Sequence, residues 1–530
     1  MVSTTTDEEK VAPANELESN PMLDQAGLPR FASIEPSNLS PAVKHLLEKL
    51  DSDFKELELK LPESSNDFDD VLPKVEMMQF PLGYVWGIAG HLNGVKNGEE
   101  LRAAYEENQA GVVKAMTQFS QSRALFDALN KVQESLEQTE GEDEFILAQK
   151  KRAVENSLRG MKLGGVGLEG ETKEKFNEIK MRLAELSTKF GNHLMDATKA
   201  YGLVIEDAEE LANVPASAKA MWANAYKMYL ASEGKEEEAE KVDAEKGPWR
   251  VTLDGPSYIA ALSHIPNRDL REQIYKASIT RASEIGDDSR NNVPLIYEIL
   301  SLKQEMSNIL GFSNYAEQSL ASKMAPSVES VAQLSELILE KALPAAEKEL
   351  AEVTALARSK GGDEYSEENM EKLKPWDVTF WSERLKEAKF DLTEEELRPY
   401  FALPRVLDGM FGLVERIFNI KVEKAIGDAE VWNKDVQFFK VFDAETEKHI
   451  ASFYLDPYSR PADKRGGAWM DVCIGKSEAC GRDVPVAYLT CNGSPPAGDE
   501  VPSLMTFREV ETLFHGKFHI LCHSCSDFQM

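Results

Sequence analysis

The sequence predicts a mostly α-helical protein with a small β-sheet near its C-terminal end. Three observations support this fold class. Long stretches repeat apolar residues every three or four positions, strand patterns appear only after residue 435, and no segment repeats at a fixed period. A chain of 530 residues is also too long for one hydrophobic core, so two or three structural units are expected.

The clearest helical pattern runs from Phe176 to Tyr201. Its apolar residues recur at spacings of three and four, which places them on one face of a helix, while Glu, Lys and Arg fill much of the other face. Similar patterns predict further helices over residues 41–60, 98–118, 143–159, 214–232, 267–283, 293–310 and 327–358.

Three late segments carry strand patterns instead. Val436–Phe442, Ile450–Leu455 and Val484–Cys491 are short and rich in β-branched and aromatic residues. The chain then returns to a helix. Thr506 is a suitable N-cap, and Glu509 three residues later completes a capping box. The apolar stripe of this last helix consists of Val510, Leu513, Phe514 and Phe518.

The pattern divides the chain into four parts. Residues 1–30 are polar and are expected to be a disordered acidic tail, followed by an N-terminal helical domain over 31–235. The main boundary is placed at 233–246, a segment with seven acidic residues. A second domain follows over 246–515, and residues 516–530 form a terminal segment of different character.

The composition excludes several function classes. With 60 Lys and Arg against 92 Asp and Glu, the formal net charge is −32, which disfavours nucleic acids and anionic membranes as partners. Five cysteines, none before Cys473, disfavour a disulfide framework. No run of 18 apolar residues and no signal peptide are visible, so a cytoplasmic protein is expected.

Two motifs are weak on their own. Gly165, Gly167 and Gly170 match a dinucleotide-binding spacing, but a helix pattern precedes them where a strand is required, so a helix–helix loop is the better interpretation. The basic stretch Arg460–Trp469 combines cations with glycines, which suits binding of carboxylates. An ordinary charged turn is the alternative for this stretch.

Three of the eight histidines lie in the last sixteen residues. His515 and His519 stand four residues apart on the predicted last helix, which is the geometry of a metal-binding HxxxH pair. The zinc-peptidase signature HExxH would need a Glu at position 516, where this chain has Gly516. A helix end that happens to carry histidines is the alternative.

The stretch SLMTFREVETLFH before Gly516 resembles the entry to the zinc-binding helix of the thimet oligopeptidase and oligopeptidase A family of metallopeptidases. Six other stretches resemble this family in the same order, and the likeness covers roughly residues 30 to 515. These stretches are Gly247–Tyr258, Arg271–Glu284, Lys374–Leu392, Arg398–Leu413, Tyr454–Met470 and Val484–Pro496.

The resemblance implies a two-part helical metallopeptidase fold with a small β-sheet near a deep channel, zinc as cofactor and short peptides as substrates. It implies that His515 and His519 are zinc ligands, and that no catalytic base is present because Gly516 replaces the family's Glu. We expect the strand Val484–Cys491 to pair with an extended peptide. The expected substrate-binding residues are Tyr458, Arg460, Arg465, Gly466 and Tyr488.

The family pattern is lost after His515. The family's third zinc ligand, a Glu on a following helix, and its later substrate-binding residues have no counterpart before Met530, so we expect the C-terminal part of the catalytic domain to be missing. If a retained intron began within the codon for the family's Glu, its translation would begin with Gly516-Lys517. His519 would then match the family's second zinc histidine only by coincidence. Such a truncation would also leave the late strands and the last helix poorly covered.

The leading functional hypothesis is therefore a monomeric, zinc-dependent metalloendopeptidase of the oligopeptidase A type that is inactive in this form. The alternative is a non-catalytic helical protein that binds peptides, or a degraded fragment. A structural zinc module of His515, His519, Cys522 and Cys525 is disfavoured, because structural sites usually close the metal between two elements.

Overall fold

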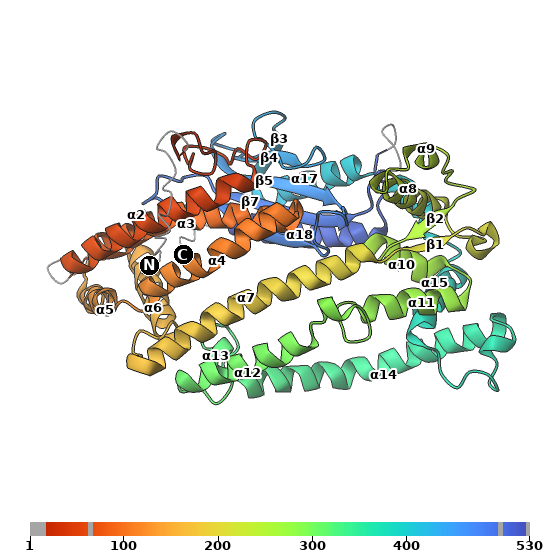
Figure 1. The fold of residues 1–530 in the computed structure, drawn as a ribbon, viewed down its shortest axis with the longest axis horizontal. Coiled ribbons are helices and arrows are strands. Elements are labelled where there is room, and N and C mark those ends of the chain that lie inside the picture. The colour runs from red at the N-terminus through yellow and green to blue at the C-terminus, as the bar shows by residue number, and fades with distance from the viewer. Residues whose placement is uncertain (1–16, 62–66, 142, 497–501, 526–530) are drawn as a thin grey trace, which may run out of the picture.

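The computed structural model describes residues 17–61, 67–141, 143–496 and 502–525, with side chains described as far as Gly516 in the last range. Within these ranges the fold is mostly helical with small β-sheets, which confirms the predicted fold class (Figure 1). The helices of the first part are α2 (Leu39–Lys60), α3 (Phe68–Val95), α4 (Glu99–Ser120), α5 (Arg123–Gln138), α6 (Glu144–Leu163) and α7 (Gly170–Ala200).

The second part of the chain contributes further helices and all seven strands of the described residues; in Figure 1, α12 and α14 lie below α7, away from the five-stranded sheet. These helices are α8 (Ala216–Ser232), α9 (Glu236–Ala239), α10 (Gly255–His264), α11 (Arg268–Ile279), α12 (Val293–Ile309), α13 (Tyr315–Leu320), α14 (Val328–Lys360), α15 (Pro375–Phe390), α16 (Glu394–Leu397), α17 (Leu403–Phe418) and α18 (Phe507–Cys525).

Every stretch that the sequence predicts as a helix contains one, although α11 ends at Ile279, four residues before the predicted end. The sequence pattern missed α5, α9, α10, α13, α15, α16 and α17. It also missed α3. This helix carries Pro73 and Pro81 in its interior and several glycines, all of which weaken a helix prediction. The glycine motif lies in the turn between α6 and α7, as predicted, with Gly165 at φ +87°.

The five-stranded sheet has the order β3-β4-β5-β7-β6, with β5 and β7 parallel and the other neighbours antiparallel. A second, two-stranded sheet pairs β1 with β2. The strands are β1 (Leu203–Ile205), β2 (Trp249–Val251), β3 (Ile420–Lys424), β4 (Gln437–Asp443), β5 (His449–Tyr458), β6 (Trp469–Ile474) and β7 (Val486–Gly493).

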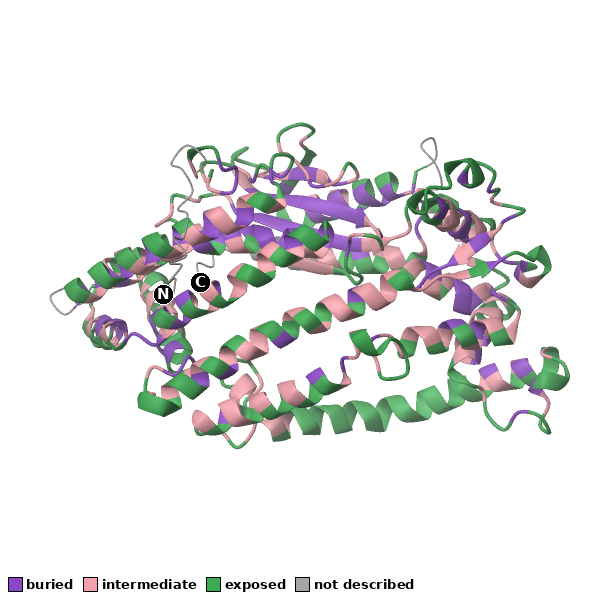
Figure 2. Ribbon diagram, in the orientation of Figure 1, coloured by how far each residue is buried: buried purple, intermediate pink, exposed green. Residues whose placement is uncertain are grey.

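The central strands β5 and β7 of the five-stranded sheet are buried on both faces (Figure 2). Side chains alternate between the faces along a strand, so Tyr454 and Tyr488 pack into a core with the N-terminal helices, while Phe453 and Leu489 pack into a core with α17 and α18. All four side chains are at most 2% exposed. The expectation that the late strands are poorly covered is therefore wrong.

The boundary predicted at 233–246 does not separate two cores. Trp222 and Leu230 of α8 share one hydrophobic cluster with Val242, inside the predicted boundary, and with Trp249 on β2. The acidic side chains of the segment face solvent while Val242 and Ala239 anchor it. The acidic residues of this segment therefore indicate an exposed surface and not a boundary between two domains.

The predicted disordered tail is too long. Residues 1–16 lie outside the described residues, but Met22 is 1% exposed and belongs to the same core as Phe31. The side chain of Asn20 donates a hydrogen bond of 2.9 Å to the carbonyl of Asn38. Residues 17–30 are therefore part of the folded structure.

Candidate active site

Helix α18 begins with the predicted capping box. The backbone N–H of Glu509 donates to the Thr506 hydroxyl at 3.1 Å, and the Thr506 N–H donates to the Glu509 carboxylate at 2.7 Å. The same carboxylate accepts hydrogen bonds from the N–H and the hydroxyl of Ser494, just after β7. Glu509 therefore fixes the start of α18 against the end of a central strand.

One face of α18 packs on the sheet. Leu513 is 2% exposed and joins the core that contains Leu489 of β7. A Cβ added to Gly516 would lie 2.9 Å from the Leu489 side chain, so Gly516 faces the sheet closely. Phe514 is 36% exposed and His515 is also exposed on the outer side of the helix.

The described residues supply one predicted metal ligand, His515. The side chains of His519, Cys522 and Cys525 lie outside the described residues, so the HxxxH pair and the four-ligand module stay predictions. Among the described side chains, no three His, Cys, Asp or Glu residues come close enough together to hold a metal ion. The described donors therefore do not fit a complete zinc site.

The basic stretch after β5 is built around a buried carboxylate. Asp456 and the side chain of Lys464 are both fully buried, and Lys464 donates to the Asp456 carboxylate at 2.8 Å. Arg460 donates both of its terminal nitrogens to the same carboxylate, at 2.7 and 2.9 Å, and Trp432 adds an indole N–H at 2.9 Å. Burial alone would raise the pKa of Asp456, but the two cations outweigh it and hold the pKa below its usual range.

This stretch also holds the end of α3. Arg460 donates to the carbonyl of Val95 at 3.0 Å, and the N–H of Arg465 donates to the carbonyl of Gly94 at 2.8 Å. Helix C-termini leave carbonyls without partners inside the helix, and cations stabilise them. The role assigned to Arg460 in substrate binding is therefore not supported, because its guanidinium is already shared between Asp456 and α3.

Two of the predicted substrate-binding residues lie at the surface. Arg465 is exposed, with its guanidinium 4.5 Å from the ring centre of Trp469, and Gly466 beside it is exposed with open space around it. Tyr458 is half-buried against the core under α18, and burial raises the pKa of its phenol. Its carbonyl accepts a hydrogen bond from Lys464 at 2.7 Å.

Tyr488 was predicted to contact substrate, and the structure contradicts this. Its side chain is 1% exposed, and its ring stacks on His91 of α3 with the ring centres 3.6 Å apart. Burial lowers the pKa of His91 to about 3; Asp456 opposes this shift, and Lys464 and Arg460 add to it, all with smaller effects. Tyr488 therefore joins the N-terminal helices to the sheet.

The strand predicted to pair with a peptide is also an interior strand. Both edges of β7 are hydrogen-bonded, to β5 on one side and to β6 on the other. An extended peptide cannot add to a strand whose two edges are occupied. The sequence pattern identified this strand correctly but gave no information on strand order.

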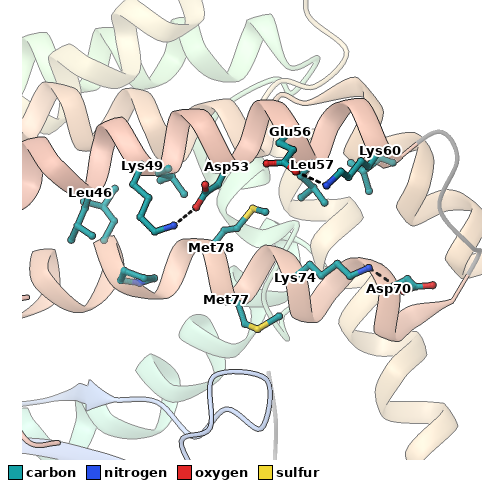
Figure 3. A pocket seen from close by; sticks show the side chains of 14 residues that line it. Leu46, Lys49, Asp53, Glu56, Leu57, Lys60, Asp70, Lys74, Met77 and Met78 are labelled. Carbon is teal, nitrogen blue, oxygen red and sulfur yellow. Dashed lines mark hydrogen bonds and ion pairs between the residues drawn. The ribbon is translucent and has the colours of Figure 1, made fainter. Parts of the chain in front are cut away.

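A groove of about 480 Å³ lies between α2 and α3 (Figure 3). Its floor is apolar, with Leu46 and Met78 among the lining residues, and its rim carries ion pairs such as Lys49 with Asp53 and Lys74 with Asp70. Among the described residues, no histidine, cysteine or serine lines it. Its carboxylates Asp53, Glu56 and Asp70 are paired with lysines, so nothing described in the groove points to a hydrolytic site.

Asp456 is the main residue of this region that sequence reasoning missed. A signal was present, because Asp456, Arg460 and Lys464 stand at successive spacings of four. The sequence alone made the cations look available for a ligand, since it did not show that Asp456 and Lys464 are buried and that Arg460 is bound to the same carboxylate.

Two protein-family models match this chain, one in its first part and one in its second. The model described as Peptidase family M3 matches residues 261–529, about half of the chain, and the model described as Neurolysin/Thimet oligopeptidase, N-terminal domain matches residues 43–173. The chain belongs to peptidase family M3. The M3 match includes the whole five-stranded sheet and α18, so the Glu509 cap and the Asp456 cluster both lie within the family region.

Individual relatives support the same membership. The chain is 40% identical to Organellar oligopeptidase A, chloroplastic/mitochondrial of Arabidopsis thaliana, over 97% of this chain and 62% of that protein. It is 39% identical to Probable cytosolic oligopeptidase A of Arabidopsis thaliana and 38% identical to Oligopeptidase A of Haemophilus influenzae, over 70% of each. This M3 chain thus spans between about three fifths and seven tenths of the length of these relatives.

None of the described helices of this M3 chain is long and apolar enough to cross a membrane.

Proposed function

We propose that this chain is part of a zinc-dependent oligopeptidase that cleaves short peptides, and that the chain with this sequence does not hydrolyse them. The observation that carries the proposal is the placement of His515. Within a family M3 match, the capped helix α18 lies across the central strands and presents His515 on its outer, exposed side. Zinc bound in such a protein would polarise a peptide carbonyl and activate water.

The lack of hydrolysis follows from residue 516. The family resemblance assigns this position to the general base, and glycine has no group that can accept a proton. Loss of a general base alone costs about 10²–10⁴-fold in rate. A side chain at 516 would also meet the end of the Leu489 side chain, which would have to shift to admit it.

The test measures cleavage of a quenched-fluorescent peptide, with zinc content determined in parallel. We expect no turnover above buffer for the purified chain, and none for Gly516→Glu. Chelator-sensitive cleavage that His515→Ala abolishes would show that the chain is an active peptidase and would contradict the proposed inactivity. Cleavage by this chain that His515→Ala leaves intact would contradict the zinc assignment.

Peptide binding without cleavage is a second candidate function. One observation favours it: Arg465, stacked on Trp469, is exposed beside Gly466 and can approach a peptide carboxylate. Fluorescence anisotropy with a labelled pentapeptide tests it. Arg465→Ala should weaken binding at least tenfold, while Arg123→Ala, on the exposed face of α5, should not; equal binding by both variants would contradict the assignment.

We further propose a monomeric protein of the cytosol whose partners are short peptides. The printed names of its relatives include both a cytosolic and an organellar oligopeptidase A. Cell fractionation with an antibody to the chain distinguishes the two compartments.

A further inference from the structure

Three tyrosine hydroxyls are buried in the core between α3 and the five-stranded sheet. Tyr84 comes from α3, Tyr454 from β5 and Tyr488 from β7, and all three residues belong to one hydrophobic cluster. They are 5%, 0% and 1% exposed, and none of the three hydroxyls has a hydrogen-bond partner among the residues that the structure describes. This tyrosine cluster therefore places three polar atoms in a core that is otherwise mostly apolar.

The members of the tyrosine cluster lie close to one another. Tyr454 and Tyr488 are partners in the register of β5 and β7, with ring centres 5.8 Å apart. The thiol of Cys473, on the neighbouring strand β6, lies beside Tyr488. Burial raises the pKa of all three phenols, and the thiol of Cys473 raises each of them further. The phenol of Tyr84 also raises the pKa of the other two, so groups from α3, β5, β6 and β7 meet at one place.

Hydroxyls without partners would weaken the fold at this place. A buried polar group that lacks a hydrogen bond lowers the ratio of folded to unfolded chain by roughly 5- to 150-fold. The thiol of Cys473 does not remove this cost, because a thiol donates and accepts hydrogen bonds only weakly. The rings of Phe31, Trp432 and Phe438 pack around Tyr454, so its other neighbours are mostly apolar. The hydroxyls therefore need a partner from outside the chain.

We infer that the tyrosine cluster is a binding site for an ordered water molecule, which hydrogen-bonds to all three hydroxyls. Buried waters in proteins typically make about three hydrogen bonds to polar groups that otherwise lack partners. A phenol both donates and accepts a hydrogen bond, and a water molecule donates two and accepts two. Two phenols accept from the water while the third donates to it, so each phenol oxygen gains a partner.

The charge state of the cluster favours water over an ion. Because burial raises their pKa values, the three phenols stay protonated and neutral near pH 7. Burial also raises the pKa of the Cys473 thiol to about 12. Metal ions are bound by thiolates and other deprotonated groups, and an ion of either sign among neutral groups would carry the cost of burying a charge. A neutral molecule that donates and accepts hydrogen bonds meets neither obstacle.

Such a water would fix how α3 lies on the sheet. Tyr84 belongs to the N-terminal part of the chain, whereas Tyr454 and Tyr488 belong to the two central strands. Apolar packing between these parts has no preferred direction, but hydrogen bonds to a shared water require a narrow range of distances and angles. The site is independent of the proposed peptidase function, since it concerns the seat of a helix and not the hydrolysis of a peptide.

Phenylalanine variants of the full chain test the site by urea denaturation. Tyr84→Phe and Tyr454→Phe each remove one hydroxyl and keep the ring. Each should lower the folded-to-unfolded ratio about fivefold, because one hydrogen bond to the water is lost. The double variant should lose at least threefold less than the product of the two single losses, because both hydroxyls bind the same water. As the control, Tyr400→Phe removes a hydroxyl from a residue that is 67% exposed and should change the ratio less than twofold.

Unpaired hydroxyls would give the opposite sign in the same experiment. If Tyr84→Phe or Tyr454→Phe raises the folded-to-unfolded ratio, the variant has removed an unsatisfied polar group and the water is excluded. Two single losses that multiply without coupling also exclude one shared water.

Crystal structures of the full chain and of Tyr454→Phe give the direct readout. In the unmodified chain we expect one peak of electron density within about 2.5–3.0 Å of all three phenol oxygens. The peak should weaken or vanish in Tyr454→Phe. Direct contact between the phenol oxygens, no peak, a peak that the variant leaves unchanged, or an anomalous signal from a metal ion overturns the inference.

Discussion

The five-stranded sheet and the long helix α14 are opposites in how their apolar residues are covered. Tyr488 and Leu489 are neighbours on β7 that point to opposite faces, and each is at most 2% exposed. Leu337 and Leu339 also point to opposite sides of their helix, and each is more than 55% exposed. Burial on both sides makes the sheet the centre of stability, whereas α14 depends on its own helical bonds and on α15.

The difference shows that a segment's position along the chain does not determine what it packs against. The sheet belongs to the M3 region, but one of its faces is covered by the N-terminal part of the chain, which places His91 of α3 and Phe31, in a turn before α2, against Tyr454 and Tyr488. The helices α12 and α14 lie within the same M3 region without such cover. The N-terminal helices and the sheet should therefore unfold together.

The largest expected effect concerns the buried carboxylate of the sheet. Asp456→Ala leaves Lys464 buried without its anionic partner and frees Arg460 from the end of α3. Removal of one partner from a buried ion pair costs about 3–5 kcal/mol. Urea denaturation followed by circular dichroism measures the loss.

Asp51→Ala is the matched control for this change. It breaks an exposed ion pair with Lys55 on α2, which should cost at most about 1 kcal/mol. If both variants lose the same stability, the buried charge cluster does not stabilise the sheet. The contrast between buried and exposed ion pairs would then be wrong.

A second pair of variants compares the two regions directly. Leu489→Ala opens a cavity in a core that α18 and the sheet share, and should cost about 2–5 kcal/mol. Leu337→Ala removes a side chain that is 56% exposed and should change stability by at most about 0.5 kcal/mol. Equal losses in the chain alone would mean that α14 is already covered in solution.

The third prediction concerns how low pH affects the stability of the contact between α3 and the sheet. Burial lowers the pKa of His91 in the folded chain to about 3, whereas an unfolded histidine has an ordinary value of about 6.5. Below about pH 6.5 the unfolded state binds the proton first, so stability falls as the pH falls. Between pH 7 and pH 5 the loss from this group is about 2 kcal/mol.

Denaturation at several pH values checks this effect. His91→Phe should flatten the dependence of unfolding free energy on pH between 7 and 5. Leu92→Ala, a buried position on the same helix, should lower stability by a similar amount at every pH and keep the wild-type slope. An unchanged slope in His91→Phe would show that His91 is not buried as a neutral ring.

The sequence predicted secondary structure better than it predicted which residues are buried and what covers them. Periodicity identified α7 and α14 because the spacing of apolar residues is a local property, and it failed for α3, where prolines and glycines hide a buried helix. The capping box at Thr506 was correct for the same reason, because it involves residues three positions apart. Strand order could not be predicted, so β7 was wrongly given a free edge.

The candidate site shows the same limit. The family resemblance directed attention to His515 and to the basic stretch, but Arg460 proved to be bound to Asp456 and α3. Whether a cation is free for a ligand depends on partners far away in the sequence, such as Val95 at a separation of 365 residues. The zinc pair stays a prediction, since the side chain of His519 lies outside the described residues.

The smallest expected effect compares two helix caps. At the start of α18, the backbone N–H of Glu509 donates to the Thr506 hydroxyl at 3.1 Å. At the start of α14, the backbone N–H of Ser330 donates to the Ser327 hydroxyl at 3.2 Å. Loss of either cap costs its helix about 1 kcal/mol. The two losses should nevertheless appear in different measurements, because α18 is packed into the sheet core and the first turns of α14 are not.

Thr506→Ala should therefore lower the global free energy of unfolding by about 1 kcal/mol. Ser327→Ala should leave the global value unchanged and speed hydrogen exchange only at the first amides of α14, since local opening there does not require the core to unfold. A global loss from Ser327→Ala would mean that α14 unfolds together with the sheet. The contrast between the two regions would then be one of exposure alone, without a difference in stability.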